Sequence, residues 1–304
     1  MLPMMLPADA RVELAPPVLS VAISPNSHAQ SVSTSNTRAS SQSQTSTRDP
    51  FGLDGKVAIV TGSSRGIGRA IATALARAGA RVVVSSRKAD ACAKVVQALA
   101  DEGLEAMAIG CHAGRREELE RLVDSTIERY GRLDICVANA AANPVLGPLA
   151  KLPEDAWDKV MNTNVRAVFQ LAGIALPHLE RSGEGSFLAI SSIGALRTER
   201  GIGAYNISKL ALVGLVQNLA SEWGRRGVRV NAIAPGFIRT DFSRALWENP
   251  EAMDRVRLMT PLQRIGEPED IGAVAVFLSA AASRFITGQT IVADGGVTLV
   301  SAIG

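Results

Sequence analysis

The sequence predicts an α/β protein in which helices cover both faces of a parallel sheet. From Phe51 onward, short apolar runs alternate with amphipathic stretches, and this alternation builds parallel strands joined by crossover helices. The first apolar run, residues 57–61, also leads directly into a glycine-rich turn, which is typical of a tight strand-to-helix connection. The 304 residues are enough for one such domain, expected over residues 51–304, together with an appendage.

Seven apolar runs are expected to form the strands. They cover residues 57–61, 81–85, 104–110, 133–138, 186–191, 228–234 and 290–293. Amphipathic stretches are expected to form the helices, at residues 67–78, 89–102, 117–130, 154–180, 204–225 and 271–281. This succession predicts a doubly wound Rossmann fold with a seven-stranded parallel sheet. Ligands of such a sheet bind at the carboxyl ends of its strands, so the functional residues are expected there.

The first fifty residues have a different composition. Residues 31–47 contain eleven Ser or Thr among seventeen residues, and so few apolar side chains cannot offset the entropy lost on ordering. Residues 1–50 are therefore expected to be a disordered Ser/Thr-rich tail. Four prolines and two acidic residues within the first seventeen interrupt the pattern of a secretory signal. No apolar run reaches the about 18 residues that cross a bilayer, so no membrane partner is expected.

Charge and cysteine usage exclude further classes. The net charge of +3 is small and dispersed, so a nucleic-acid partner is not expected. Cys92, Cys111 and Cys136 stand at unrelated spacings in apolar stretches, which indicates free buried thiols in a reducing compartment. A cytoplasmic location is the corresponding expectation. No metal-ligand spacing is present, and no metal is expected.

The glycine-rich turn, residues 61–68, is the first candidate site. Free N–H groups and the helix dipole at the start of a helix attract phosphate, so this turn favours a dinucleotide. Tight turns also need glycine for structural reasons alone. The turn contains Gly62-x-Ser64-x-Gly66, which matches the nucleophile elbow of serine hydrolases. That class requires a late histidine, however, and the last histidine is His178.

Tyr205 and Lys209 are four residues apart, so on a helix their side chains face the same way. A ketone that accepts a hydride develops negative charge on its oxygen, which must receive a proton. Tyrosine is a suitable acid if its pKa falls below the usual value of about 10, and a nearby ammonium, helped by the positive nicotinamide ring of an oxidised cofactor, would favour the phenolate. We therefore expect Tyr205 to be the acid/base and Lys209 its electrostatic partner. A simple surface pair is the alternative interpretation of this spacing.

The cofactor is predicted from the residues after the second expected strand. NAD-binding domains place an Asp or Glu about 20 residues beyond the glycines. This chain has Ser86 there, followed by Arg87 and Lys88, with Arg65 in the glycine-rich turn. These cations would attract a 2′-phosphate that a carboxylate would repel. NADP(H) is therefore preferred and NAD(H) remains possible, unless these residues are ordinary solvated charges.

Residues 53–297 resemble the short-chain dehydrogenase/reductase superfamily. The motifs that carry the resemblance are Thr61-Gly62-x-x-x-Gly66-x-Gly68, Asn139-Ala140-Ala141, Asn164, Ser192, Tyr205-x-x-x-Lys209 and Pro235-Gly236. Shorter segments are similar to the NADPH-dependent carbonyl/retinal reductases found in peroxisomes: Ser85-Ser86-Arg87-Lys88, Cys111-His112, Asn139-Ala140-Ala141-Ala142-Asn143-Pro144 and Arg264-x-Gly266-Glu267-Pro268-Glu269-Asp270. The chain departs from the common pattern at Ala138, where the family usually has Asn, at Ala141, where it usually has Gly, and at His112, where it usually has Asp.

The resemblance implies roles for individual residues. Ser192 and Tyr205 would bind the substrate oxygen, Lys209 would also bind the ribose, and Asn164 would hold a water that links Lys209 to solvent. Asn164, Ser192, Tyr205 and Lys209 are thus the candidate catalytic residues. The implied cofactor site consists of Gly62, Ser64, Arg65, Gly66, Ile67, Gly68, Ser86, Arg87, Lys88, His112, Asn139, Ala140, Ala141, Tyr205, Lys209, Pro235, Gly236, Ile238 and Thr240. A homotetramer built from the helices of Asn164 and Tyr205 and the last strand is implied as well.

The expected function is hydride transfer between NADP(H) and a carbonyl or secondary-alcohol substrate, in the direction of ketone or aldehyde reduction. Residues 235–268 supply apolar side chains suited to a lid over a hydrophobic substrate, although core or subunit contacts would give the same pattern. A 3-oxoacyl reductase and an NAD-linked secondary-alcohol dehydrogenase are alternatives on the same residues. A non-enzymatic binder is disfavoured because Ser192, Tyr205 and Lys209 are all present.

Overall fold

The computed structural model describes residues 49–143 and 145–300. Nearly all of the predicted tail therefore lies outside the described residues. The remaining chain forms a seven-stranded sheet in the order β3-β2-β1-β4-β5-β6-β7, with every neighbouring pair parallel. The predicted doubly wound α/β fold is confirmed. The strands are β1 (Val57–Thr61), β2 (Arg81–Ser86), β3 (Ala106–Gly110), β4 (Ile135–Ala138), β5 (Gly185–Ile190), β6 (Val228–Pro235) and β7 (Thr290–Ala293).

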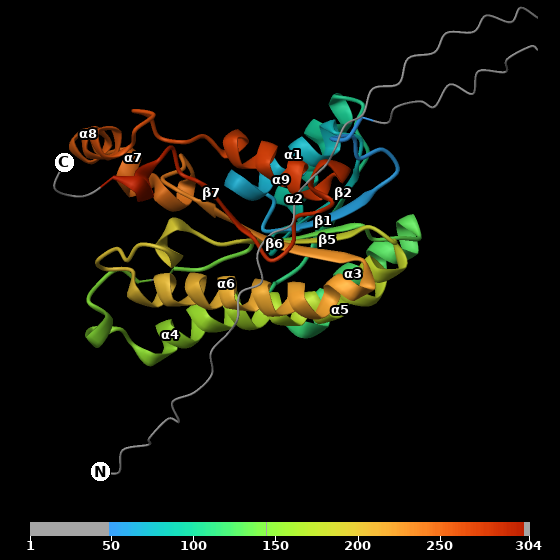
Figure 1. The fold of residues 1–304 in the computed structure, drawn as a ribbon, viewed down its shortest axis with the longest axis horizontal. Coiled ribbons are helices and arrows are strands. Elements are labelled where there is room, and N and C mark those ends of the chain that lie inside the picture. Colours follow the sequence, from blue (N-terminus) through green and yellow to red (C-terminus); the bar gives the residue numbers. More distant parts are fainter. Residues whose placement is uncertain (1–48, 144, 301–304) are drawn as a thin grey trace, which may run out of the picture. The chain divides into compact units, whose positions relative to one another are not determined.

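Helices cover both faces of the sheet (Figure 1). One face carries α1 (Gly66–Arg77), α2 (Ala89–Asp101) and α9 (Pro268–Ser279), and the other carries α3 (Arg116–Tyr130), α5 (Ala167–Arg181) and α6 (Gly203–Trp223). Three shorter helices are α4 (Glu154–Met161), α7 (Arg244–Trp247) and α8 (Pro250–Met259). Because the central strands are buried on both faces, the structure has one apolar core on each side of the sheet, and the edge strands β3 and β7 are partly exposed.

One predicted helix differs from the structure. Residues 154–180 were expected to be continuous, but a π-helical turn, Asn162–Arg166, separates α4 from α5. The buried side chain of Asn164 lies in this turn and hydrogen-bonds outside its own helix. Single π-turns of this kind often occur at functional sites. The helical periodicity of the sequence shows only that the segment is helical and does not reveal the inserted residue.

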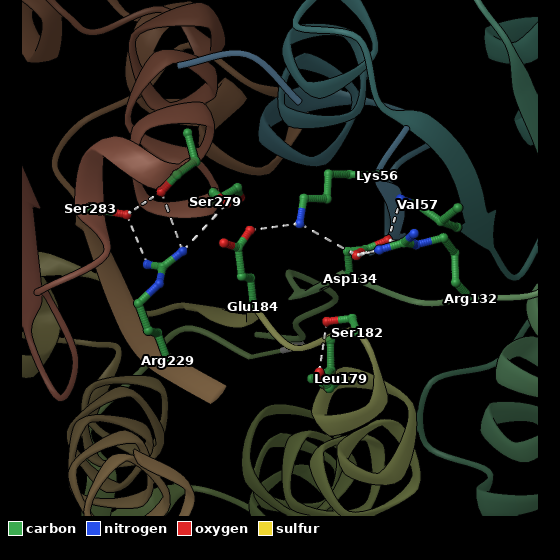
Figure 2. A network of polar contacts seen from close by, with 11 residues as sticks. Lys56, Val57, Arg132, Asp134, Leu179, Ser182, Glu184, Arg229, Ser279 and Ser283 are labelled. Atoms are coloured by element: carbon green, nitrogen blue, oxygen red, sulfur yellow. Dashed lines mark hydrogen bonds and ion pairs between the residues drawn. The ribbon is translucent and has the colours of Figure 1, made fainter. Parts of the chain in front are cut away.

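The amino edge of the sheet is held by a polar network around Asp134, which is fully buried (Figure 2). Its carboxylate accepts two hydrogen bonds from Arg132, at 2.8 and 2.6 Å, and one of 2.9 Å from the backbone N–H of Val57. Lys56 lies 3.7 Å from the same carboxylate and 3.0 Å from Glu184. The network therefore fixes the start of β1 beside β4 at the edge opposite to the carboxyl ends of the strands.

The strand order reverses between β1 and β4, the two strands from which the chain winds in opposite directions. The register pairs Thr61 with Ser85 and Val60 with Val137, so the loops after β1, β2 and β4 all leave the sheet at the same edge. In open α/β sheets such a reversal opens a crevice between the outgoing loops. The fold thus brings the motif-bearing loops together.

Candidate functional site

A cleft of about 1550 Å³ opens at the carboxyl edge of the sheet. Every residue predicted to bind the cofactor or the substrate lines it. Among the four candidate catalytic residues, Ser192, Tyr205 and Lys209 line the cleft, whereas Asn164 lies behind its wall. Within the described ranges, no group of three or more His, Cys, Asp or Glu residues could hold a metal ion. Over the same residues, no helix is long and apolar enough to cross a membrane.

The glycine-rich turn is clamped to the end of β4 by Asn139. Its side-chain amide donates to the carbonyl oxygens of Thr61, at 2.8 Å, and Gly62, at 3.2 Å. The Thr61 hydroxyl in turn accepts the backbone N–H groups of Asn139 and Ala140, at 3.0 and 3.2 Å. A Cβ atom on Gly68 would lie 2.4 Å from the Asn139 amide nitrogen. Only glycine therefore allows the turn, the helix and the Asn139 side chain to approach this closely.

The start of α1 has the properties of a phosphate site. No side chain caps the first turn of this helix, so its N–H groups remain available to a ligand. Gly62 and Gly66 have φ values of 66° and 54°, which the turn requires and other residues rarely adopt. The backbone thus leaves an open cradle at the mouth of the cleft, and these features fit a dinucleotide pyrophosphate.

The predicted 2′-phosphate residues surround the cleft at the ends of β1 and β2. The Arg87 and Lys88 side chains are exposed, and the first turn of α2, which follows Lys88, also lacks a side-chain cap. The Ser86 hydroxyl is 3.1 Å from the sulfur of Cys92. Arg65 makes an ion pair of 3.3 Å with Asp241, but its side chain is 72% exposed. Because such an exposed pair is weak, Arg65 remains able to bind an anion.

His112 lines the cleft just after β3, at a position where the family usually has an aspartate. Its backbone N–H donates to the Glu118 carboxylate at 2.7 Å, and its ring nitrogen Nδ1 accepts the N–H of Gly114 at 3.1 Å. The hydrogen bond from the His112 N–H is the largest cause of a lowered pKa of Glu118, and Arg115 and Arg121 act in the same direction. Glu118 therefore organises this loop, although the sequence did not mark it as a site residue.

Tyr205 and Lys209 face each other on α6, with the Lys209 ammonium 5.4 Å from the centre of the Tyr205 ring. Burial raises the pKa of Tyr205 to about 12, while a hydrogen bond with Ser192 acts in the opposite direction. Burial also lowers the pKa of Lys209 to about 8. From the sequence, a lowered tyrosine pKa was expected with the oxidised cofactor bound. In the cofactor-free chain the pKa is raised instead, because removal from water outweighs the favourable contacts in this part of the cleft.

Ser192 is aligned by the backbone beside it. Its Oγ accepts the N–H of Gly194 at 3.1 Å, so its hydroxyl proton remains available for another acceptor. The neighbouring Ser191 donates to the carbonyl of Lys209 at 3.0 Å. The loop after β5 is thereby tied to α6, and Ser192 is held close to Tyr205.

Asn164 joins three parts of the site. Its side-chain oxygen accepts the N–H of Ala142 at 2.8 Å, and its amide donates to the Ala142 carbonyl at 3.0 Å and to the Ser208 hydroxyl at 2.9 Å. The π-helical turn is therefore fastened to the loop after β4 and to α6. Ser208 was not identified from the sequence, because a serine in a helix is usually unremarkable.

The loop after β6 closes over the tyrosine. The Phe242 ring lies 5.8 Å from the Tyr205 ring, centre to centre, and 61% of Phe242 is exposed. The Trp247 indole donates to the Thr240 carbonyl at 2.7 Å and so anchors the loop. A Cβ atom on Gly236 would lie 2.7 Å from Asp294. This close approach explains the glycine where the loop leaves the sheet. Phe242 thus provides an apolar surface beside the candidate acid/base.

Known proteins share this sequence and architecture. A family model for enoyl-(acyl carrier protein) reductase matches residues 62–298. The chain is 43% identical over 249 residues to human dehydrogenase/reductase SDR family member 4, covering 82% of this chain and 89% of that protein. Its bovine counterpart is 44% identical over 244 residues, with 80% and 88% covered.

Two solved structures also superpose closely. A gluconate 5-dehydrogenase from Burkholderia cenocepacia, in complex with NADP and tartrate, has a TM-score of 0.80 and 33% identity, over 83% of this chain and 99% of that one. A 7α-hydroxysteroid dehydrogenase in complex with NADH and 7-oxo glycochenodeoxycholic acid has a TM-score of 0.78 and 37% identity, over 81% and 96%. One of these similar proteins is thus seen with NADP and the other with NADH.

Proposed function

This chain belongs to the short-chain dehydrogenase/reductase family, and we propose that it reduces ketones or aldehydes with NADPH. The chain is a dehydrogenase/reductase that acts on alcohol or carbonyl groups. The observation that carries the finer proposal is the arrangement of Tyr205, which hydrogen-bonds with Ser192 and lies 5.4 Å from Lys209 in the cleft. A carbonyl oxygen placed there would meet two hydroxyl donors at once.

The chemistry follows from the protonation states of these groups. A bound nicotinamide supplies the hydride. As the carbonyl carbon accepts it and the carbon–oxygen double bond becomes a single bond, Tyr205 donates its hydroxyl proton to the oxygen. With its raised pKa, Tyr205 carries that proton at neutral pH, which suits reduction. Ser192 donates its hydroxyl proton to the same oxygen as a hydrogen bond and so orients the carbonyl.

Lys209 has a different task. Its ammonium donates one hydrogen bond, to the Ile190 carbonyl at 2.7 Å, and two further N–H donors remain. These suit a ribose hydroxyl or a water in the cleft. Because the pKa of Lys209 is lowered to about 8, this side chain exchanges protons readily near neutral pH and can help to restore the proton of Tyr205. Asn164 fixes the shape of the site around it.

NADPH is proposed over NADH because positive charges gather where a 2′-phosphate would lie. Arg65, Arg87 and Lys88 line the cleft. Ser86 stands where NAD-binding domains carry a carboxylate, and its small side chain leaves space for a phosphate and offers it a hydroxyl donor. The NADP of the gluconate 5-dehydrogenase structure is consistent with this proposal. The NADH of the hydroxysteroid dehydrogenase shows why the preference must be measured.

We further propose that the chain forms a homotetramer and that it works in a reducing, cytoplasmic compartment. Large apolar side chains lie exposed on the elements implied by the family resemblance: Phe169 on α5, Leu210 on α6 and Phe285 just before β7. Such surface favours subunit contact. The three cysteines are free and buried, as expected for a reducing environment. Light scattering of the purified chain, with Phe169→Glu combined with Leu210→Glu as the disrupting variant, tests the assembly.

The experiment that tests the activity is NADPH oxidation against ketones, aldehydes, 1,2-dicarbonyls and a 3-oxoacyl thioester, with NADH in parallel. Tyr205→Phe serves as the background control. Tyr205-dependent turnover of simple carbonyls with NADPH is expected. Preference for the thioester would identify the 3-oxoacyl reductase alternative, and preference for NADH with secondary alcohols would identify the dehydrogenase alternative.

A further inference from the structure

Glu199 is a carboxylate on the cleft wall that the chemistry above does not use. It lies in the loop between Ser192 and α6, is partly buried and lines the cleft. The Asn206 side chain donates to the Glu199 backbone carbonyl at 3.0 Å, and Gly147 donates to the carbonyl of Gly201 at 2.9 Å. Contacts on both sides therefore hold this loop in place.

The carboxylate itself makes no hydrogen bond and no ion pair with the other side chains among residues 49–143 and 145–300, and the charge of Arg197 acts on it only from a greater distance. Arg197 lowers the pKa of Glu199 through its charge, but its guanidinium donates to the carbonyls of Val297 and Val300, at 3.2 and 3.4 Å. Burial is the larger effect and raises the pKa of Glu199. The carboxylate is thus partly withdrawn from water, and it faces the cleft with its oxygens free to accept from a ligand.

The second carboxylate on the described cleft wall shows the contrast. Asp241 makes ion pairs with Arg65 and Arg244, so its charge is already compensated. Glu199 lies instead on the Tyr205 side of the cleft, and its negative charge raises the pKa of Tyr205. The cations Arg65 and Arg87 come from the loops after β1 and β2, at the cofactor end. The substrate end thus carries a carboxylate that forms no ion pair with the described residues.

We propose that Glu199 selects substrates by charge, favouring carbonyl compounds that carry a cation or a hydrogen-bond donor and rejecting those that carry a carboxylate near the carbonyl. This inference rests on the proposed reductase function. A buried carboxylate binds an ammonium, amidinium or hydroxyl group directly, whereas a second carboxylate would be repelled and desolvated without compensation. Small oxo acids are therefore expected to be poor substrates, and amino or hydroxy ketones good ones.

The test uses nearly isosteric ketones that differ in charge: acetophenones with an amidinium, a nitro group or a carboxylate at the meta or para position, the nitro group being neutral and without a hydrogen-bond donor. Values of kcat/KM with NADPH are measured for the wild type and for Glu199→Gln. In the wild type the amidinium compound should exceed the carboxylate by at least about tenfold at one of the two positions. Glu199→Gln should reduce that ratio to within about threefold, chiefly through KM, while kcat/KM for the neutral nitro compound changes less than kcat/KM for either charged compound.

Two controls separate the possible failures. Glu222→Gln removes one exposed carboxylate from α6 and should leave the charge preference intact. Glu199→Asp should retain the preference in part. If the wild type turns over none of the ketones in a Tyr205-dependent way, the proposed function fails. If turnover is present but the wild type does not discriminate by charge, or Glu199→Gln discriminates equally well, the selection by Glu199 is refuted.

Discussion

The Lys209 ammonium donates a 2.7 Å hydrogen bond to the carbonyl oxygen of Ile190, and Lys209 is only 2% exposed. A buried ammonium destabilises the folded chain when its acceptor is neutral and, as among the described residues here, no carboxylate pairs with it. The proposed function uses a cation at this position, so we expect the site to trade stability for function. The effect should be visible in the dependence of stability on pH.

The first prediction concerns this dependence. The pKa of Lys209 is about 8 in the folded chain, below its usual 10.5. Between these values the unfolded chain holds the proton and the folded chain does not, so the free energy of unfolding rises with pH. Below pH 8 the full cost of the buried charge is present. Relative to Lys209→Met, the cofactor-free wild type should therefore gain about 2 kcal/mol between pH 7.5 and 9.5 in urea unfolding. A constant difference would mean that Lys209 titrates normally.

The second prediction concerns the acid/base. Tyr205→Phe removes the transferable proton but keeps the ring that packs against Phe242. Carbonyl reduction should fall by about 10² or more, with melting temperature and NADPH affinity nearly unchanged. Steady-state rates, thermal unfolding and NADPH fluorescence titration check the three quantities. Activity retained within about tenfold of the wild type would remove Tyr205 from the mechanism.

The third prediction concerns cofactor choice. Ser86→Asp combined with Arg87→Ala removes one cation and adds a carboxylate beside the expected 2′-phosphate. Each lost charge-assisted hydrogen bond corresponds to about 1.5–3 kcal/mol, so the NADPH/NADH preference should fall by well over tenfold. The comparison needs kcat/KM for both cofactors in both proteins. A wild type that prefers NADH, or an unchanged ratio in the double variant, would show that these residues are ordinary surface charges.

The site shows what the sequence could and could not predict. The pair Tyr205 and Lys209 could be predicted because residues four apart on a helix lie on the same face. The glycine-rich turn could be predicted because its backbone conformation favours glycine. Glu199 and Asp241 were missed, since a single acidic residue in a loop carries no periodicity and no fixed spacing. The raised pKa of Tyr205 in the cofactor-free chain was not predicted, because burial depends on the packing of distant segments, here the loop of Phe242, which local sequence does not reveal.

The strands were predicted to within about two residues because each is an apolar run that ends in polar or glycine residues. The break at Asn164 was not predicted. A π-helical turn there depends on partners 22 residues before and 44 residues after it in the chain, and no helical periodicity records such contacts. The separate predictions for the tail and the subunit assembly remain to be tested.

The fourth prediction concerns the amino edge of the sheet. Asp134→Ala removes the buried acceptor of two Arg132 bonds and of the Val57 N–H. The free energy of unfolding should fall by about 3 kcal/mol, because a charged hydrogen-bond network is lost in the core. The KM values should hardly change, since this network lies at the opposite edge from the cleft. Denaturant unfolding and kinetics at low temperature separate the two effects, and a variant as stable as the wild type would contradict the role of Asp134.

The fifth prediction concerns the N-terminal segment. A chain that begins at Asp49 should unfold and turn over like the full chain. That starting point keeps Pro50, whose carbonyl accepts the N–H of Ala282 at 2.8 Å, and Phe51, whose ring lies 6.3 Å from that of Phe277. Melting temperatures and rates of the two chains are compared directly. A large loss in the shorter chain would show that residues 1–48 contribute to the domain.

The strand order has a consequence for how the protein becomes active during synthesis. The cleft is built from loops that span Gly62 to Thr240, and β6 is paired on its outer side by β7, near the end of the chain. A growing chain that contains only the first half of the domain therefore lacks part of the cleft. It cannot be active, even if that half has already collapsed. Regained turnover after dilution from denaturant should consequently report the last step of assembly, with spectroscopic signals of the helices recovering earlier.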